Sequence, residues 1–469
     1  MTRVPVFVVV FVMAVAMGVW GLDRGSMWQD EATTFAIASR SLGDLFATLG
    51  NVDAVHGLYY LIVHFALKLP GDPEVLIRLP SVLATGFAAV AVAAAARRMG
   101  GSGLAAGAAY TLLPVVSHYA QDGRSPALVC AAVALAVYAL VRESWVWYAV
   151  AVTVAAYLNL TALLVLAAFA VPGVLIDWRR WALASGAAVL ATVPLILVAY
   201  PQSGQVARLT PPTWEDAGNL VSGFAGVPAL LAILALLRAG PLRVVALPLM
   251  VVPPAFLLLL SQVKPYYEER YVLYAVVGLA LLIGSAVDGV ARLAHPAVAV
   301  PVAAAVLAVV LLPVWPRQAE TRQIASRRDD PAAAARLIGS MARPGDTVLF
   351  LPSVRRLVAE AYPADFRHLN DAALAESGTE SGTLAGRELP SHEIRLGDRV
   401  WTVSRSYPKP EDLDAPADQA KQLILRYHYQ KGPVYRVLGY AVRLYVRRAK
   451  PGPPARESRK VAGLVAATE

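Results

Sequence analysis

The sequence is poor in charge and has almost no cysteine. Only 16% of its residues are charged whereas 57% are hydrophobic, a balance typical of a polytopic membrane protein. Its single cysteine, Cys130, lies in an apolar run, so no intramolecular disulfide can form. The sequence also lacks a phosphate-cradling glycine loop, a dinucleotide fingerprint, and CxxC or HExxH motifs. No motif for nucleotide or zinc chemistry is therefore present.

Near-uninterrupted runs of alanine, valine and leucine recur from residue 4 to residue 315. Each is close to the roughly 20 residues that a helix needs to cross about 30 Å of hydrocarbon. The first run has no small-residue cleavage site before Met27-Trp28, so we interpret it as an uncleaved span. The sequence thus predicts a polytopic α-helical protein with about eleven spans. The expected spans are 4–22, 80–96, 103–117, 126–141, 145–159, 161–177, 182–200, 217–237, 244–261, 271–291 and 296–315.

Arginines between these runs set the predicted sidedness, because Lys and Arg are retained on the cytoplasmic side of a membrane. The clusters are Arg97-Arg98, Arg142, Arg179-Arg180, and Arg238 with Arg243. Placing them inside puts the amino terminus in the cytoplasm and the chain beyond residue 315 outside. Residues 56–69 are apolar but too short to span, and we interpret them as an interfacial helix within a first outer loop at 23–79.

Beyond the expected membrane domain, 1–315, the sequence is polar and charged. This change predicts a soluble extracytoplasmic α/β domain over 316–448, with strands at 346–351, 399–403 and 441–446 and a helix at 354–362. We expect it to cover the membrane site or to contact an acceptor. A basic, proline-bearing end, 449–469, is predicted to be disordered. The net charge of +9 favours anionic headgroups or wall polymers, and nucleic acid is not an expected partner.

The predicted topology places polar residues from several separate loops at the outer ends of spans. A lone loop acid is usually a solvated charge, and a lone arginine at a span end usually reaches for headgroups. Pooling of acids, histidines and tyrosines on one face instead favours an active site. The segments concerned are Asp30-Glu31, His56, Arg78, 117–124 and 264–271.

Five short blocks in this order resemble the GT-C glycosyltransferases, and in particular the bacterial branch of the protein O-mannosyltransferase family, which includes the enzyme that adds aminoarabinose to lipid A. They are Trp28-Gln29-Asp30-Glu31-Ala32, 56–64 (HGLYYLIVH), 77–81 (IRLPS), 119–124 (YAQDGR) and 269–273 (ERYVL). The matches cover residues 1–315. This chain departs from the family at His56-Gly57-Leu58, where many relatives have His-Pro-Pro, and at Gln121-Asp122-Gly123-Arg124, where many have Gln-Glu-Ala-Arg.

The resemblance implies an inverting glycosyltransferase that moves a sugar from a polyprenyl-phosphate carrier to an acceptor hydroxyl on the outer face. It assigns the general base to Asp30, beside which Glu31 would orient a neighbour or bind sugar hydroxyls. Cations are needed for the departing phosphate. For this role we predict Arg270 first, then Arg78 and Lys264. The residues predicted to line the sugar or acceptor pocket are His56, Tyr59, Tyr119, Gln121, Asp122, Arg124, Tyr267 and Glu269.

The sequence leaves several points open. The acids and histidines of the outer face could bind a divalent metal, but no spacing is diagnostic, and no other cofactor is expected. The sugar could be mannose or another hexose or pentose, and the acceptor a protein, a glycan or a lipid. Two other classes remain alternatives: a transporter or flippase for lipid-linked sugars, which should carry charges near the membrane midplane, and a non-catalytic scaffold with an outer binding domain.

Overall fold

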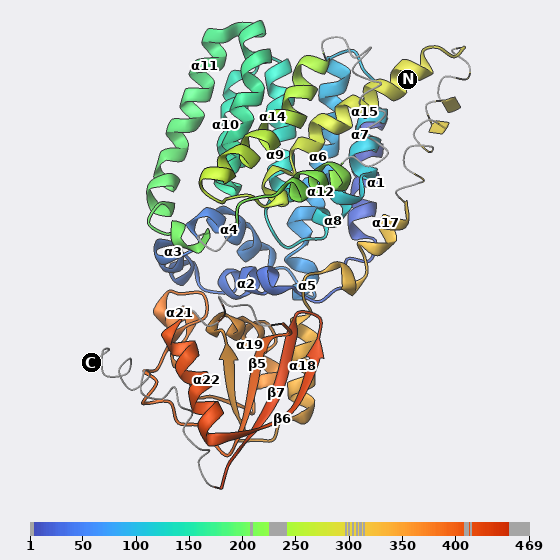
Figure 1. Cartoon of the computed structure of the whole chain (residues 1–469). Coiled ribbons are helices and arrows are strands. Elements are labelled where there is room, and N and C mark those ends of the chain that lie inside the picture. Colours follow the sequence, from blue (N-terminus) through green and yellow to red (C-terminus); the bar gives the residue numbers. More distant parts are fainter. Residues whose placement is uncertain are drawn as a thin grey trace. The chain divides into compact units, whose positions relative to one another are not determined.

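The computed structural model describes residues 4–206, 210–224, 242–295, 298, 301–302, 304–305, 308, 312, 315–407, 412 and 415–449 (Figure 1). Contacts divide the chain into two units. The membrane unit comprises Met1–Gly25 and Leu49–Ser326, and the α/β unit comprises Ser26–Thr48 and Arg327–Glu469. The predicted outer loop at 23–79 is thus shared between the two units, and its segment with Asp30 belongs to the α/β unit.

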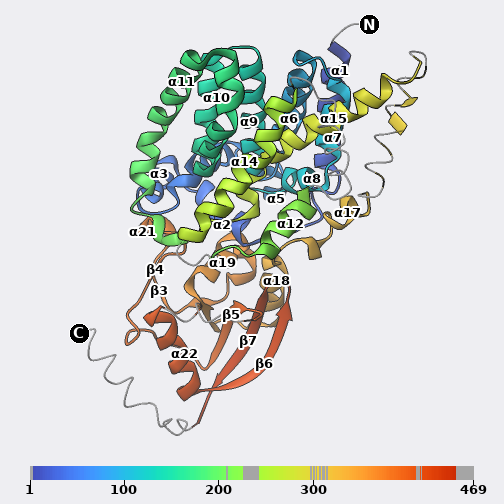
Figure 2. The same ribbon diagram turned by 45° about the horizontal axis from the view of Figure 1, so that its top comes forward.

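Among the described residues of the membrane unit, the regular elements are helices (Figure 2). Three helical stretches are long and apolar enough to cross a membrane, namely Pro73–Arg98, Leu160–Ala199 and Leu242–Val263, which supports a membrane location. Its helices are α1 (Val4–Val19), η1 (Ala54–His56), α4 (Gly57–Ala66), α5 (Pro73–Leu76), α6 (Leu79–Arg98), α7 (Gly103–Leu112), α8 (Pro114–Ala120), α9 (Pro126–Val141), α10 (Trp145–Leu158), η2 (Leu160–Leu164), α11 (Val165–Ala199), η3 (Ser203–Val206), α12 (Trp214–Phe224), α14 (Leu242–Val263), η4 (Glu269–Val272), α15 (Ala275–Ala291), α17 (Trp315–Glu320) and η7 (Ile324–Ser326).

Most expected spans correspond to helices with nearly the predicted ends. The run at 103–117 is divided into α7 and α8 because Pro114 starts a new helix at its first turn. The runs at 161–177 and 182–200 join in α11, which is broken at Asp177 (φ −159°, ψ 96°). There Asp177 Oδ1 accepts the backbone N–H of Arg180 at 3.1 Å, as an N-cap does. Parts of the expected spans at 217–237 and 296–315 lie outside the described residues.

Small residues allow the membrane helices to approach closely. α6 lies between α1, α7 and α9, and its alanines are buried on several sides. A Cβ added to Gly284 of α15 would lie 2.6 Å from the Cα of Ala106 in α7, and one added to Gly86 would lie 2.7 Å from the ring of Phe11. Without a hydrophobic drive between helices in lipid, such backbone proximity maximises dispersion contacts.

The α/β unit is built around a five-stranded sheet with the order β2-β1-β5-β7-β6. β1 is parallel to β2 and β5, whereas β7 is antiparallel to β5 and β6. The strands of the whole α/β unit are β1 (Thr347–Leu351), β2 (Asn370–Asp371), β3 (Leu374–Glu376), β4 (Arg387–Glu388), β5 (Arg399–Arg405), β6 (Tyr429–Val437) and β7 (Tyr440–Arg447), of which β3 and β4 pair outside the five-stranded sheet. Its helices are α2 (Gln29–Ala38), α18 (Pro331–Met341), η8 (Ser353–Arg356), α19 (Leu357–Ala361), α20 (Pro363–Phe366), α21 (Gly378–Ser381) and α22 (Pro416–His428), and α3 (Leu42–Asn51) crosses the boundary between units.

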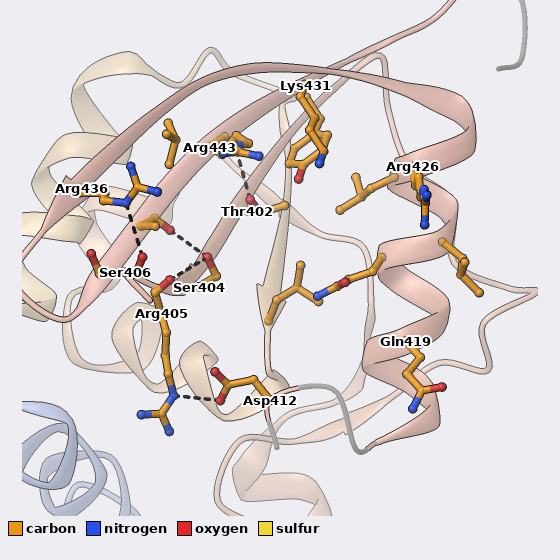
Figure 3. A pocket seen from close by; sticks show the side chains of 17 residues that line it. Thr402, Ser404, Arg405, Ser406, Asp412, Gln419, Arg426, Lys431, Arg436 and Arg443 are labelled. Carbon is orange, nitrogen blue, oxygen red and sulfur yellow. Dashed lines mark hydrogen bonds and ion pairs between the residues drawn. The ribbon is translucent and has the colours of Figure 1, made fainter. Parts of the chain in front are cut away.

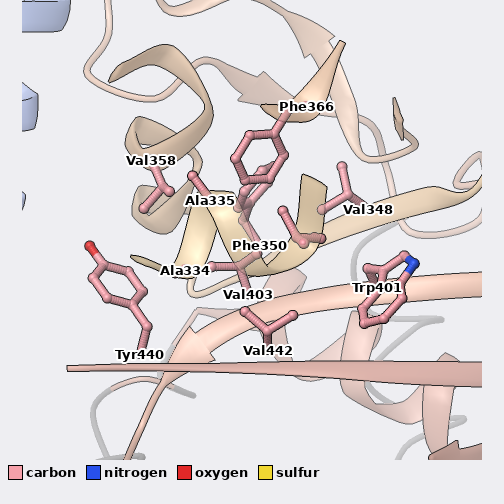
Figure 4. Close-up of a cluster of buried hydrophobic side chains, with 11 residues drawn as sticks. Ala334, Ala335, Val348, Phe350, Val358, Phe366, Trp401, Val403, Tyr440 and Val442 are labelled. Carbon is pink, nitrogen blue, oxygen red and sulfur yellow. The ribbon is translucent and has the colours of Figure 1, made fainter. Parts of the chain in front are cut away.

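Alternation along the strands gives this sheet two different faces. One carries Phe350, Trp401 and Val442 and packs under α18 (Figure 4). The other carries Leu349 and Val400, against which α22 packs through Leu425. The strands predicted at 346–351, 399–403 and 441–446 and the helix at 354–362 are confirmed, whereas β6 and α22 were not foreseen.

Candidate active site

The acid pair Asp30-Glu31 lies in the first turn of α2, in the α/β unit. Helix α2 begins after Trp28, whose backbone N–H donates to Glu31 Oε2 at 3.3 Å, the reciprocal half of a capping box. This bond fixes Glu31, which is fully buried, while Asp30 is half-buried. Of the pair, Asp30 is therefore the carboxylate with access to solvent.

The chain just before and within this turn is held by side chains about 300 positions away in the sequence. Because these partners belong to the start of α18 and to the end of α19, the acid pair is fixed to the body of the α/β unit. The three bonds run from Ser26 Oγ to Asp330 Oδ1 at 2.7 Å, from Met27 N to Tyr362 OH at 3.0 Å, and from Gln29 N to Asp329 Oδ1 at 2.8 Å.

Asp329 is an unforeseen member of this site. It is buried, it forms an ion pair of 3.6 Å with the buried Arg355, and Arg355 also lies over the ring of Tyr440 at 4.6 Å. Burial raises the pKa of Asp329, and the charge of Asp30 raises it further against the opposing effect of Arg355. The pattern Asp329-Asp330-Pro331 was a signal in the sequence, since an acid before proline often begins a helix.

A second polar cluster lies in the membrane unit, where η1 meets the start of α9. Arg124 Nη2 lies 3.0 Å from His56 Nε2, and Arg124 Nη1 donates to Tyr60 OH at 3.3 Å. Tyr60 OH in turn donates to Asp53 Oδ2 at 2.8 Å. The structure therefore brings together the predicted pair His56 and Arg124 and adds Asp53 and Tyr60, which sequence reasoning missed.

Other residues predicted to line the pocket form hydrogen bonds or ring contacts within the membrane unit. Tyr59 OH donates to the carbonyl of Ile77 at 3.0 Å, and Gln121 Nε2 donates to those of Gly18 and Trp20 at 2.9 and 2.8 Å. The backbone carbonyl of Asp122 accepts from Ser81 Oγ at 2.7 Å, and the ring of Tyr119 meets that of His118 edge-on at 5.1 Å. The bonds of Gln121 and Asp122 stabilise the loop 121–124. A role of the same residues in a sugar pocket stays a prediction.

Arg78, predicted to bind donor phosphate, is fully buried in the membrane unit. Its Nη1 donates to the backbone carbonyls of Leu22 at 2.9 Å and Gly25 at 2.7 Å, just beyond the end of α1. These bonds give Arg78 a structural task where the first helix ends.

The predicted phosphate-binding loop, 264–271, lies between α14 and α15. Arg270 lies over the ring of Tyr271 at 5.8 Å and is half-buried, while Lys264 lies over the ring of Tyr266 at 5.1 Å and is exposed. A hydrogen bond with Tyr266 raises the pKa of Lys264, which therefore stays charged at neutral pH. Burial and then the charge of Glu269 raise the pKa of Tyr267 to about 12, so this phenol stays neutral.

The short helix η2 connects this loop to the cluster around His56. Thr161 Oγ1 donates to the carbonyl of Tyr271 at 3.0 Å, and Tyr274 OH donates to the carbonyl of Thr161 at 3.2 Å. On its other side, Leu160 packs in one cluster with Ala54 and Val55, next to His56. Within the membrane unit, η2 therefore contacts the block at 269–273 directly and packs beside the residues that immediately precede the block at 56–64.

The described residues hold no group of three His, Cys, Asp or Glu side chains that could bind a metal ion. The acids and histidines predicted as possible metal ligands therefore form no such group among the described residues.

Comparison with known proteins shows a likeness to solved structures. No protein-family model and no curated protein sequence matches the chain. The solved structure of ArnT from Cupriavidus metallidurans bound to undecaprenyl phosphate is similar with a TM-score of 0.59 at 17% identity, over 95% of this chain and 99% of that chain. Apo ArnT from the same organism gives 0.57 at 17% identity, over 93% and 97%.

A third structure, the arabinosyltransferase EmbB from Mycobacterium smegmatis, is similar over 62% of this chain and 30% of its own, at 17% identity and a TM-score of 0.41. The two ArnT structures carry the assignment of fold. The chain shares the fold of these ArnT structures, the GT-C fold that the resemblance in sequence predicted.

Proposed function

We propose that this chain is an inverting glycosyltransferase that moves a sugar from a polyprenyl-phosphate carrier to an acceptor hydroxyl. The observation that carries the proposal is the likeness of fold along nearly the whole length of both chains to a protein solved with undecaprenyl phosphate bound. The five ordered sequence blocks support it independently. We further propose that reaction occurs on the outer face of the cell membrane, with the amino terminus in the cytoplasm.

Asp30 is the proposed general base. An acceptor hydroxyl is a poor nucleophile at neutral pH, and a carboxylate that takes its proton accelerates attack by about 10² to 10⁴-fold. The half-buried position of Asp30, beside the buried and bonded Glu31, supports this division of roles. Direct attack by the hydroxyl on the anomeric carbon breaks the bond to the carrier phosphate and inverts the centre.

Arg270 and Lys264 are the proposed donors to the departing phosphate. The leaving group already carries negative charge, so it needs cations rather than a proton as the sugar-oxygen bond breaks. The ring contact of Arg270 with Tyr271 and the bond from Thr161 to the Tyr271 carbonyl would hold that guanidinium in place. Arg78 is a weaker candidate because its Nη1 serves two backbone carbonyls.

The test is transfer of radiolabelled sugar from polyprenyl-phosphate donors to endogenous acceptors in membranes that contain the wild-type chain or Asp30→Asn at matched levels. Asp30→Asn should lower transfer by about 10² or more. The control is Asp398→Asn, at an exposed acid of the same unit, and it should leave transfer unchanged.

Arg270→Gln should instead weaken capture of undecaprenyl phosphate in a direct binding assay, while Asp30→Asn should not. If wild-type membranes label nothing above membranes without the chain, the transferase proposal is wrong. Equal labelling by wild type and Asp30→Asn would remove Asp30 from the role of base. The acceptor is identified by the labelled product.

A further inference from the structure

A cavity of about 650 Å³ opens in the α/β unit between helix α22 and the sheet (Figure 3). It contains none of the residues predicted to act in transfer. This volume lies in the range of about 300 to 1,000 Å³ that small-molecule sites occupy. The cavity is therefore large enough for a ligand of two or three sugar units.

The cavity exists because α22 covers only part of one sheet face. Through Leu425 it packs on Leu349 of β1 and Val400 of β5. Further along the same face, β7 and β6 present Arg443 and Arg436, since Thr402 pairs with Arg443 and Ala441 with Arg436 across the strands. Inward positions that are basic rather than apolar leave this part of the sheet without a packed layer.

Positive charge lines the cavity from both sides. Arg436, Arg443 and Lys431 come from the sheet, and Arg426 comes from α22 (Figure 3). Among the described residues, these four side chains form no ion pair. A fifth cation, Arg405, is paired at 2.8 Å with Asp412, which is buried. Cations gathered around one concave surface repel one another, and an anionic ligand relieves that repulsion.

The remaining polar groups suit a sugar. Thr402 and Ser404 of β5 present hydroxyls to the cavity, and their bonds to strand carbonyls are long, at 3.4 Å each. Gln422 on α22 adds an amide, and the ring of Tyr445 adds a flat surface on which a pyranose can stack. Hydroxyl, amide and aromatic groups beside cations form a set for a ligand that carries both hydroxyls and negative charge.

We propose that this cavity binds an anionic saccharide, a short glycan that bears carboxylate or phosphate. Binding itself does not depend on the transferase activity. Its meaning as an acceptor site rests on the proposed function: the α/β unit would hold the acidic glycan whose hydroxyl receives the sugar.

The test measures binding of trigalacturonate to the full chain in detergent by isothermal titration, with maltotriose as a neutral ligand of the same size and inorganic phosphate as a free anion. Trigalacturonate should bind at least tenfold more tightly than either, and its affinity should fall as salt is raised. Arg443→Gln should weaken it by about tenfold or more through loss of a charge-assisted hydrogen bond. Arg395→Gln, at an exposed position outside the cavity, should bind as the wild type does.

Equal binding of trigalacturonate and maltotriose, or unchanged binding by Arg443→Gln, would overturn the proposal. Equal binding of inorganic phosphate would overturn its saccharide part and leave an anion site. Arg436→Gln, at an exposed side chain, repeats the test if Arg443→Gln fails to fold. Because the measurement needs no donor lipid, it can succeed where the transfer assay fails, and the reverse, so the two proposals stand or fall separately.

Discussion

Asp329 offers the sharpest test of how the α/β unit positions the acid pair. Its carboxylate accepts the N–H of Gln29 at 2.8 Å and pairs with Arg355, whose side chain is only 2% exposed. Asp329→Ala would leave that guanidinium buried without its carboxylate. Breaking a buried pair from one side costs about 3 to 5 kcal/mol. At about 2 to 4 °C per kcal/mol, the melting temperature should fall by roughly 10 °C.

Stability and positioning are separated by a second substitution. Asp329→Ala with Arg355→Met removes both charges, and the methionine can pack on the ring of Tyr440. Replacing a whole buried pair by apolar groups is often neutral, so the part of the lost stability that comes from the unpaired Arg355 should return. The acceptor for the Gln29 N–H stays missing, which corresponds to about 1.5 to 3 kcal/mol for a bond to a charged group.

The assays are scanning fluorimetry of the full chain in detergent, hydrogen exchange at the start of α2, and sugar transfer at a temperature where every variant is folded. The doubly substituted chain should melt between Asp329→Ala and the wild type, yet exchange faster at α2 and transfer at least tenfold more slowly than the wild type. Asp329→Asn keeps an acceptor oxygen for the Gln29 N–H. Its exchange at α2 and its transfer rate should therefore lie between those of the wild type and those of the doubly substituted chain. If the doubly substituted chain regains full transfer together with stability, Asp329 acts through stability alone and the positioning argument fails.

Three further predictions concern other parts of the chain. Burial alone would raise the pKa of Glu388, but Lys421 at 2.8 Å and a neighbouring arginine hold that pKa below its ordinary value. Because the pKa is lowered on folding, the ionised Glu388 stabilises the folded chain above about pH 4, and this contribution is lost as acid protonates the carboxylate. Glu388→Gln should remove that pH dependence in acid-unfolding curves and lower the melting temperature at pH 7. Thr161→Val should remove the hydrogen bond to the Tyr271 carbonyl and weaken undecaprenyl phosphate binding while the melting temperature changes little. An unchanged dissociation constant would contradict the link between η2 and the loop 264–271. Gly284→Leu should clash with the neighbouring helix and reduce the yield of folded protein on gel filtration, whereas normal yield would refute close packing there.

The sequence predicted the elements better than their partners. Apolar runs and flanking arginines located the membrane helices, and β-branched stretches located β1, β5 and β7. Strand β6 escaped because Gly432-Pro433 interrupts it, and the structure accommodates them with a shift of register between Lys431 and Val434. Glycine and proline in a row are normally a signal for a turn.

The candidate site shows the same limit. Asp30 and Glu31 stood out because their block resembles the GT-C glycosyltransferases, whereas the sequence around Asp329 indicated only the start of a helix, since its contact with the turn of the acid pair depends on a hydrogen bond across 300 positions. Arg78 illustrates the opposite difficulty. A conspicuous arginine in a motif was assigned to phosphate, which stays a prediction, and the structure adds that its Nη1 donates to the backbone after α1. Residue type shows what a side chain can do, whereas its packing shows what it is already doing.

The α/β unit is assembled from two chain segments that are far apart in the sequence, which has a consequence during synthesis. Residues 26–48 are synthesised early. The side chains that bind the start of α2, those of Asp329, Asp330 and Tyr362, follow about 300 residues later. At about 5 to 20 residues per second, this segment waits roughly 15 to 60 seconds for its partners while the membrane helices are inserted. A newly made chain must therefore keep α2 from pairing wrongly or being cut. Arrest of translation before residue 329 should leave that segment sensitive to protease, and release should protect it.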